Sequence, residues 1–397
     1  MSDRSQARRH CLRVAIASHD SSLHGGAERS LFSVAVALKA TGAVDPLVTV
    51  PSNGALSAAL RAWSIRTFVL PTPLWAPLRP EAFRSPVPLG GLARRSRRAL
   101  AIARLTGPWV RWLRNARPDV VVTNTAVIPT PALASAVVGI PHVWWLKEFV
   151  TKDHGLSYTL GEPASQRVIG WLSKFVVANS NAVLEHFSPP IPRDKMRMIH
   201  SGVTCLDVSP NQVDIPTLRV LLLGRQTPAK GGKVALEAAS LLESEPIRVE
   251  LRLVGSITPT FRDELDALAR RRGLAGSVQI LDHTSTPESQ ISWANVVLMC
   301  SDAEAFGRVT LEALKSGRPV IGTRSGGTPE LICDGVNGFL FEPRNAQQLA
   351  VAMRRLASEP GLLARMSENA MVGTRDRFTL DGYIEAFVEV LGAAASR

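Results

Sequence analysis

Cysteine and long apolar runs are both scarce in this chain of 397 residues. The four cysteines, Cys11, Cys205, Cys300 and Cys333, lie far apart and form no C-x-x-C pair, so neither a zinc knuckle nor a disulfide framework is supported. No stretch reaches the roughly 18 apolar residues of a transmembrane helix. The apolar stretch Val14–Ala17 is too short for a signal peptide, and this cysteine usage fits a reducing compartment. We therefore expect a cytoplasmic protein.

Three phosphate- or metal-binding motifs are also missing. Without a G-x-G-x-x-G fingerprint a nicotinamide site is disfavoured, and without a G-x-x-x-x-G-K-S/T loop ATP hydrolysis of that type is unsupported. No D-x-D sequence is present to hold a metal ion. The sequence therefore predicts neither a cofactor nor a metal.

What the chain does contain is a regular alternation of short β-rich runs and helical stretches. Hydrophobic residues make up 45% and charged residues 20%, as in globular proteins, and the length suits two domains. Alternating strands and helices predict parallel sheets covered on both faces, and two such sets predict an α/β fold with two Rossmann-like domains. The expected strands are Arg13–Ala17, Leu47–Val50, Arg66–Leu70, Val120–Thr123, His142–Leu146 and Phe175–Ala178, then Leu218–Leu223, Val249–Val254, Val278–Ile280, Val296–Cys300, Pro319–Thr323 and Gly338–Phe341.

The expected domain boundary lies in Thr204–Pro216, where Pro, Asn and Asp are frequent and the periodicity stops. We predict a first domain over residues 1–205, a second over residues 206–375, and a C-terminal helix within residues 376–397 that crosses back onto the first. Open α/β sheets bind ligands beyond the carboxyl ends of their strands, so the cleft between two facing domains is the expected site.

Positive charge is concentrated in the first half. Residues 1–205 contain 25 lysines and arginines and 11 acids, whereas residues 206–397 contain 21 and 23. Arg79–Arg117 holds ten arginines and one acid, together with Trp109 and Trp112. A basic amphipathic segment with tryptophans is typical of a surface that lies on anionic lipid headgroups, and a solvated arginine-rich helix is the alternative. Nucleic acid is not expected, because no recognised nucleic-acid motif accompanies the charge.

Two carboxylates, eight residues apart, are the most informative feature of the second half. Glu304 lies in a glycine-containing loop, and Glu312 lies one turn into the helix that follows. This spacing aims both acids, and the backbone N–H groups of Phe306, Gly307 and Arg308, at one spot beyond the end of a strand. A helix N-terminus suits a phosphate and carboxylates suit sugar hydroxyls, so the pair predicts a nucleotide-sugar site. The alternative is an unrelated loop acid and an exposed helical acid.

Two other loops carry groups suited to phosphate. Arg225 and Lys230 follow the expected strand Leu218–Leu223 and could embrace a diphosphate, although an exposed basic loop would look the same. Gly25 and Gly26 follow the first strand and would let a backbone approach a ligand at a helix N-terminus. A tight turn with glycine at positive φ explains them equally well.

These motifs together resemble the retaining glycosyltransferases of family 4, whose GT-B architecture has two Rossmann-like domains facing across a cleft. The matching segments are Gly25–Glu28, Val177–Ala182, His200–Val203, Gly224–Arg225 with Lys230–Gly231, Glu304–Glu312 and Gly326–Glu330. The resemblance implies that Gly26 lies by the donor phosphates and that Arg225 and Lys230 bind the diphosphate. It also implies that Glu304 contacts the donor sugar and Glu312 the ribose.

The sequence departs from the family pattern at one position. Many members place a His before an acid at the end of the strand expected at His142–Leu146, where the His contacts the transferred sugar. Here Lys147 precedes Glu148, and His154 follows seven residues later. Either Lys147 or His154, or neither, could approach the sugar. A surface ion pair between Lys147 and Glu148 is the alternative.

The resemblance implies transfer of a hexose-type sugar from a nucleoside diphosphate to a hydroxyl with retention. We expect no metal, because Arg225 and Lys230 can stabilise the charge on the leaving phosphate. In this family the leaving phosphate itself is thought to deprotonate the acceptor. The catalytic candidates are Arg225, Lys230, Glu304 and Lys147. The basic first domain favours a lipid-linked acceptor at the inner membrane face and a role in cell-envelope polysaccharide assembly, and a soluble acceptor is the alternative. Two alternatives stay open: a non-catalytic nucleotide-sugar-binding protein, which the missing His favours, and a sugar-nucleotide 2-epimerase of the same architecture.

Overall fold

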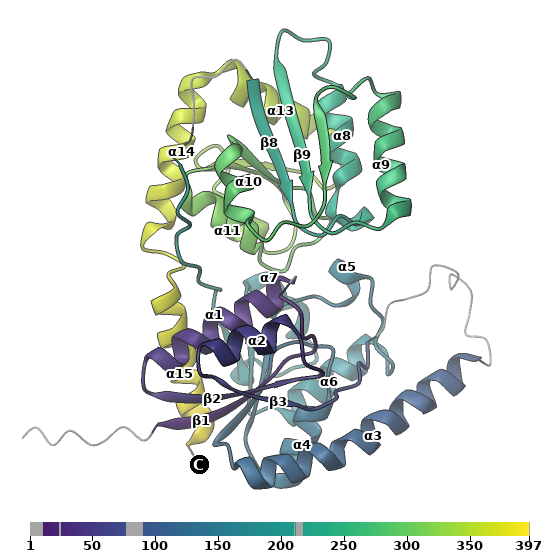
Figure 1. Ribbon diagram of the computed structural model, residues 1–397, viewed down its shortest axis with the longest axis vertical. Coiled ribbons are helices and arrows are strands. Elements are labelled where there is room, and N and C mark those ends of the chain that lie inside the picture. Colours follow the sequence, from purple (N-terminus) through teal and green to yellow (C-terminus); the bar gives the residue numbers. More distant parts are fainter. Residues whose placement is uncertain (1–10, 24, 77–89, 210, 212–216, 397) are drawn as a thin grey trace, which may run out of the picture. The chain divides into compact units, whose positions relative to one another are not determined.

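The structure is a computed structural model that describes residues 11–23, 25–76, 90–209, 211 and 217–396. The chain divides into two compact units: Met1–Gly202 together with Leu380–Arg397, and Val203–Thr379. Each unit is built on one sheet of parallel strands with helices on its faces (Figure 1). The predicted α/β fold with two Rossmann-like domains is therefore confirmed.

Seven parallel strands form the sheet of the first unit, in the order β3-β2-β1-β4-β5-β6-β7. The strand order reverses between β1 and β4, the kind of switch point at which open α/β sheets bind ligands. The strand β2 includes Pro46, which lies opposite Val14 of β1, and a proline disfavours a strand assignment from sequence alone. The strands are β1 (Leu12–Ala17), β2 (Val44–Val50), β3 (Arg66–Val69), β4 (Val120–Thr123), β5 (His142–Leu146), β6 (Phe175–Ala178) and β7 (Met196–Met198), the last of which was not predicted.

Eight helices of the described residues belong to the first unit: α1 (Gly26–Ala40), α2 (Ala55–Ala62), α3 (Gly90–Ala116), α4 (Thr130–Val138), α5 (Thr151–His154), α6 (Glu162–Leu172), α7 (Asn181–Phe187) and α15 (Leu380–Ala395). The helices α1, α2 and α15 share one apolar core with alternate residues of the central strands. The C-terminal helix α15 belongs to this core through Tyr383 and Phe387, and Phe387 packs 4.6 Å from the ring of Trp145. Helix α4 packs against β4 and β5.

The arginine-rich segment forms the long helix α3, which packs along α4. Trp109 is 1% exposed, and Trp112 lies edge-on to it at 5.8 Å and to Phe68 at 5.2 Å. The expectation of a lipid-facing surface is therefore wrong for Trp109, whereas Trp112 is half-buried. Packing an indole ring removes a large apolar area from water, which stabilises the fold. The contacts of both rings therefore hold the C-terminal half of α3 against the rest of the unit.

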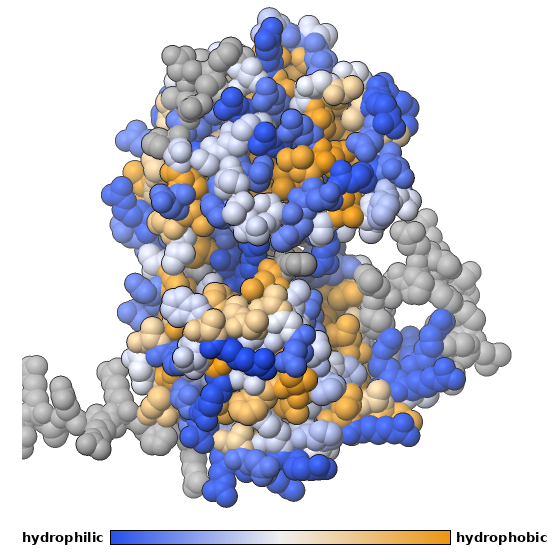
Figure 2. Space-filling model, in the orientation of Figure 1, coloured by the Kyte–Doolittle hydropathy of each residue, from blue (hydrophilic) through white to orange (hydrophobic). Residues whose placement is uncertain are grey.

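The arginines of α3 remain on the outside of the unit. Arg94, Arg95 and Arg97 are exposed, and Figure 2 shows hydrophilic side chains along this helix. The part of the predicted basic segment from Arg79 to residue 89 lies outside the described residues. Among the residues that the structure describes, no helix is both long enough and apolar enough to cross a bilayer.

Six parallel strands form the sheet of the second unit, in the order β10-β9-β8-β11-β12-β13, with a switch point between β8 and β11. The strands are β8 (Thr217–Leu223), β9 (Arg248–Val254), β10 (Val278–Leu281), β11 (Val296–Met299), β12 (Val320–Thr323) and β13 (Gly338–Phe341). The helices are α8 (Gly232–Ser240), α9 (Pro259–Arg271), α10 (Pro287–Trp293), α11 (Arg308–Lys315), α12 (Thr328–Leu331), α13 (Ala346–Ser358) and α14 (Pro360–Arg375). All six predicted strands of this half are confirmed to within a few residues.

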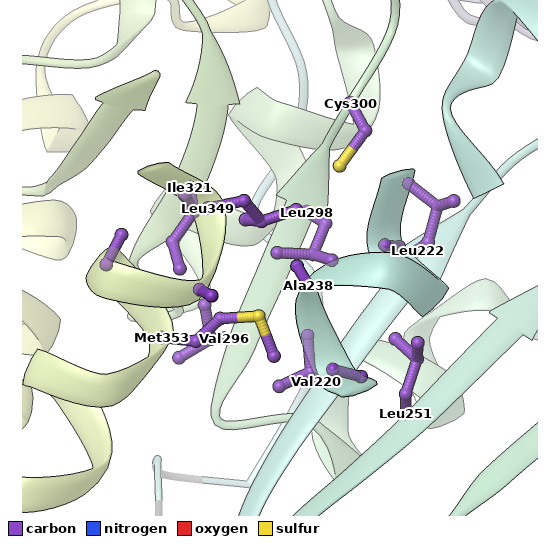
Figure 3. Close-up of a cluster of buried hydrophobic side chains, with 14 of the residues drawn as sticks. Val220, Leu222, Ala238, Leu251, Val296, Leu298, Cys300, Ile321, Leu349 and Met353 are labelled. Carbon is purple, nitrogen blue, oxygen red and sulfur yellow. The ribbon is translucent and has the colours of Figure 1, made fainter. Parts of the chain in front are cut away.

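Apolar side chains of these strands fill a core on each face of the sheet. On one face, alternate residues of β8, β9, β11 and β12, such as Val220 and Leu298, meet Ala238 of α8 and Leu349 and Met353 of α13 (Figure 3). On the other face, residues of the same strands pack against α10 and α11. Strands that are apolar on both faces are expected of a parallel sheet that helices cover twice.

Candidate functional site

The loop after β8 is locked against the end of β11 by a glycine. A short 3-10 helix, Pro228–Lys230, leads to Gly231, which has φ 75°. A Cβ atom at Gly231 would lie 2.3 Å from the carbonyl oxygen of Cys300, so only glycine fits. The N–H of Asp302 also donates to the carbonyl of Ala229 at 3.0 Å. The position of Lys230 is therefore fixed relative to the loop that follows β11.

Lys230 and Glu304, two of the predicted site residues, are in direct contact. The Lys230 Nζ lies 2.7 Å from Glu304 Oε2, and the Ser301 hydroxyl donates to the same oxygen at 3.2 Å. Both side chains are largely shielded from solvent, at 26% and 17% exposure. The residue predicted to bind the diphosphate is thus ion-paired with the residue predicted to contact the sugar.

Two adjacent glycines hold the loop that carries Glu304. Gly326 has φ 59°, and a Cβ atom there would lie 2.1 Å from the Glu304 carbonyl oxygen. A Cβ atom at Gly327 would lie 2.4 Å from the Ala305 carbonyl oxygen, and the Gly327 N–H donates to the Glu304 carbonyl at 2.7 Å. Two backbones that lie this close require glycine, which explains the Gly–Gly pair after β12.

Helix α11 places Glu312 beside Arg308. Gly307, with φ 92°, is the N-cap residue, and no side chain caps the first turn. The Arg308 Nε donates to Glu312 Oε1 at 2.7 Å, and Glu312 is buried. Phe306 is also buried, and its ring lies 6.1 Å from that of Phe378. The uncapped first turn is a place where an anion can accept backbone hydrogen bonds.

Arg225 is an exposed cation of the loop after β8. Its neighbour Gln226 is buried and donates from Nε2 to the carbonyl of Gly224 at 2.8 Å and to that of Val254 at 3.3 Å. Gln226 therefore joins the ends of β8 and β9 and directs the preceding residue outward. Within the part of the chain that the structure describes, the Arg225 guanidinium has no hydrogen-bond or ion-pair partner.

Gly25 and Gly26 begin α1 in the first unit. Gly25 has φ −86°, so the alternative of a turn with glycine at positive φ is wrong. A Cβ atom at Gly25 would lie 2.0 Å from Glu28 Oε2, because the buried Glu28 side chain folds back over the start of the helix. The His19 Nε2 lies 3.4 Å from the other oxygen of Glu28. Packing against Glu28 thus accounts for the glycine at position 25.

Lys147 lies at the end of β5 and reaches toward α1. Its Nζ donates to the Ser30 hydroxyl at 3.0 Å and lies 3.3 Å from the centroid of the Trp145 ring. Glu148 is buried and accepts hydrogen bonds from the Ala126 N–H at 2.6 Å and from the Thr125 hydroxyl. The alternative of a surface ion pair is therefore wrong for Glu148, which holds the β4 loop.

A strained turn follows, which the sequence did not reveal. Val150 is fully buried with φ 72° and ψ −61°, and the Thr151 N–H donates to the Phe149 carbonyl at 2.9 Å across it. A β-branched residue rarely adopts this γ-turn, and such strain concentrates at functional sites. The buried Asp153 accepts from the Phe149 N–H at 2.9 Å, and His154 lies half-exposed at 3.7 Å from Asp153.

The acidic groups around this turn act on Tyr158. Burial, followed by the negative charges of Glu148, Glu162 and Asp153, raises the pKa of Tyr158 well above its usual value.

Within the described residues, no three His, Cys, Asp or Glu side chains come together as a metal site. Gly25, Gly26, Lys147 and His154 belong to the first unit, and the other predicted site residues belong to the second.

Comparison with known proteins identifies the family. The model of the family "Glycosyl transferases group 1" matches residues 211–372, and the model "Glycosyltransferase Family 4" matches residues 24–205. The two matches take in most of both units. The chain belongs to the family-4 glycosyltransferases of the GT-B type, and the resemblance seen in the sequence is confirmed.

Individual relatives are distant. A D-inositol 3-phosphate glycosyltransferase of Xylanimonas cellulosilytica is 29% identical over 72% of this chain and 69% of its own length. The lipopolysaccharide core biosynthesis glycosyltransferase LpsE of Rhizobium meliloti is 28% identical over 44% of this chain and 49% of its own. The crystal structure of Anabaena HepE in complex with UDP-glucose superimposes with a TM-score of 0.75 at 22% identity, covering 96% of this chain and all of that one.

Proposed function

We propose that this protein is a retaining glycosyltransferase that moves a hexose-type sugar from a nucleoside-diphosphate sugar to a hydroxyl acceptor. The observation that carries the proposal is the carboxyl edge of the second sheet, where Arg225, Lys230 and the uncapped first turn of α11 offer positive charge and N–H donors. The bound UDP-glucose of Anabaena HepE, which shares the fold, supports a nucleotide-sugar donor.

In this proposal, charge that develops on the departing β-phosphate is stabilised by Arg225 and Lys230. The guanidinium offers two donors in a fixed plane, and the ammonium acts as a point charge. Because glycines fix the loops that carry these groups, little reorganisation is needed when the bond to the sugar breaks. Two protein cations at this place supply the charge that a metal supplies in other transferases, so we propose a metal-independent reaction.

The two glutamates would grip the ends of the donor. Carboxylates accept hydrogen bonds from hydroxyl groups, so Glu304 is assigned to the sugar and Glu312 to the ribose. Phe306 and Gly307 shape the loop between them, and Arg308 orients Glu312. In the first unit we assign Lys147 to the transferred sugar, with its ammonium oriented by Ser30 and Trp145.

The decisive experiment compares Arg225→Ala with Arg219→Ala. Arg225 lies in the loop after β8, whereas Arg219 lies within β8 and its Nε is 3.8 Å from the Glu250 carboxylate of β9. Loss of Arg225 should reduce donor hydrolysis and transfer by about 10²–10³-fold, as loss of one oxyanion donor does. Arg219→Ala should leave both rates nearly unchanged. Turnover that survives in Arg225→Ala, with sugar still released from the donor at the wild-type rate, contradicts the proposal.

We further propose that the acceptor is lipid-linked or part of a cell-envelope polysaccharide, and that α3 lies on an anionic membrane surface. The exposed arginines of α3 supply the attraction, about 1 kcal/mol for each basic side chain near such a surface. With Trp109 buried and Trp112 half-buried against Phe68, we assign this contact to the arginines and not to the tryptophans.

Vesicle flotation tests the membrane contact. The triple variant Arg94→Gln/Arg95→Gln/Arg97→Gln should lose recovery with vesicles that contain anionic lipid. The matched control replaces three exposed arginines of the second unit, Arg270, Arg271 and Arg272, by glutamine. The control should float like the wild type. Equal recovery with neutral vesicles, or no recovery with either kind, contradicts an electrostatic contact.

A further inference from the structure

Both carboxylates of the predicted pair already have a cationic partner from their own unit. Glu312 accepts from Arg308, four residues earlier on the same helix, so this pair moves with α11. Glu304 instead contacts Lys230, which comes from the loop after β8. The second pair therefore joins two separate loops at the point where the diphosphate is proposed to bind.

The loop of Glu304 is held in place by its neighbour Asp302. The Arg344 guanidinium donates to both carboxylate oxygens of Asp302, at 3.0 Å and 2.5 Å. The Ser325 hydroxyl donates to the Asp302 carbonyl at 2.8 Å, and the Asp302 N–H reaches Ala229. Bidentate arginine pairs fix geometry as well as charge. Asp302 thus fastens the loops after β8, β11, β12 and β13 to one another.

Glu304 contacts the lysine that is proposed to bind the diphosphate, so it interacts differently with a free nucleoside diphosphate and with its sugar ester. The terminal phosphate of a free nucleoside diphosphate has a second ionisation near pH 6 and is close to doubly charged at pH 7. In the sugar ester that phosphate carries one charge fewer and presents sugar hydroxyls, which donate hydrogen bonds to a carboxylate. Glu304 would therefore repel the free diphosphate and accept the sugar-bearing donor.

We propose that Glu304 is a specificity residue that favours the nucleoside-diphosphate sugar over the free nucleoside diphosphate, and that Asp302 and Arg344 are positioning residues that hold it there. This inference rests on the proposed donor site. Besides contacting the sugar, Glu304 then repels the free nucleoside diphosphate by its like charge. Because the free diphosphate is also the product, the same repulsion hastens its release.

The test is the binding of free diphosphates and their sugar esters to wild type and Glu304→Gln. Calorimetry with UDP and UDP-glucose, GDP and GDP-mannose, and ADP and ADP-glucose identifies the pair that binds. Glu304→Gln should bind the free diphosphate about 10-fold more tightly than the wild type does, equivalent to about 1.4 kcal/mol, and its sugar ester no more tightly. An unchanged ratio of the two affinities, or weaker binding of the free diphosphate, overturns the inference alone.

Matched variants separate specificity from general damage. Glu312→Gln removes a carboxylate that is paired within its own helix, so it should weaken both ligands alike and leave their ratio unchanged. Arg344→Gln should reduce the discrimination without touching Glu304 or Lys230, with little change in melting temperature. Arg324→Gln is its control, because Arg324 pairs with Asp334 at 2.7 Å on the neighbouring loop and should leave the ratio as in the wild type.

If Arg344→Gln and Arg324→Gln show the same ratio of affinities for the free diphosphate and its sugar ester, Asp302 and Arg344 have no positioning role. A wild-type protein that binds none of the six probes defeats the proposed function itself, and the inference falls with it. The two failures are thus distinguishable, because only the first occurs in a protein that binds a donor.

Discussion

At the carboxyl edge of the second sheet, glycines and ion pairs hold the loops, whereas at the same edge of the first sheet hydrogen bonds to buried polar groups do so. Gly231, Gly326 and Gly327 each lie against another backbone where no Cβ fits. In the first unit, Glu148 binds backbone and hydroxyl donors of the β4 loop. A residue whose Cα lies against another backbone must be glycine, whereas a residue that only makes a side-chain hydrogen bond can be replaced by another polar residue. The second edge therefore carries the recognisable motif.

The largest expected effect comes from Gly326→Ala. Alanine at φ 59° costs about 1–3 kcal/mol for the conformation alone, and the added Cβ would also strike the Glu304 carbonyl. We expect a lowered melting temperature and loss of the thermal shift that the binding nucleotide sugar produces. Gly335→Ala is the matched control, because Gly335 has φ 78° with nothing within 4 Å of its Cβ position. If both variants behave alike, contact with the Glu304 loop does not matter.

The second comparison concerns a buried titratable group of the first unit. His142 is fully buried between Thr123 and Ser173, at 2.8 Å and 3.2 Å from its ring nitrogens, and burial lowers its pKa from 6.5 to about 3. Between these values only the unfolded chain binds the proton, so the stability that the neutral ring provides is complete above pH 6.5. It is lost as the pH falls, by up to about 1.4 kcal/mol for each pH unit.

Tryptophan fluorescence can follow this loss, because seven of the eight tryptophans lie in the first unit and Trp293 alone lies in the second. The fluorescence-detected unfolding midpoint in urea should fall as the pH is lowered from 6.5 toward 4. In His142→Asn this slope should be shallower, whatever the stability of the variant at pH 7. Parallel slopes in the two proteins would show that other groups cause the acid sensitivity.

A buried charge distinguishes the second unit. Arg318 is 1% exposed and donates to the carbonyls of Ala294, Ser316 and Ser292, which lie at the ends of α10 and α11. Arg318→Met would leave these carbonyls without their donor, at about 1–3 kcal/mol for a buried unsatisfied group. Urea unfolding followed by circular dichroism measures the cost. The exposed Arg324→Met is the control, and equal losses in the two variants would contradict a role for the buried carbonyl contacts.

The smallest expected effect is that of Gly25→Ala. Its φ of −86° suits any residue, and the added Cβ would meet only the end of the Glu28 side chain. We expect a cost below about 1 kcal/mol in the first unit, in contrast to Gly326→Ala. A double-mutant cycle with Glu28→Gln checks the cause. A loss as large as that of Gly326→Ala would show that the start of α1 tolerates no side chain.

The sequence predicted the strands well because parallel strands buried on both faces are continuous apolar runs, as Val120–Thr123 and Val296–Met299 show. It placed Arg225 and Lys230 in the loop after β8, Glu304 in the loop after β11 and Glu312 in the helix that follows, and the structure has them there. It could not show that Lys230 and Glu304 touch, because 74 residues separate them in the chain. It also mistook Trp109 for a surface residue, since an arginine-rich helix hides which side of it packs on α4.

The two Rossmann-like units and the family could thus be predicted from the sequence. The alternation of apolar strands and helices, the positions of the glycines and the spacing of Glu304 and Glu312 are all visible along the chain. Only the tertiary structure decided which charges meet, which glycines are required by a neighbouring backbone, and that Val150 adopts a strained turn. These properties depend on segments that are distant in sequence, and the free energy of their contacts is not encoded in any one segment.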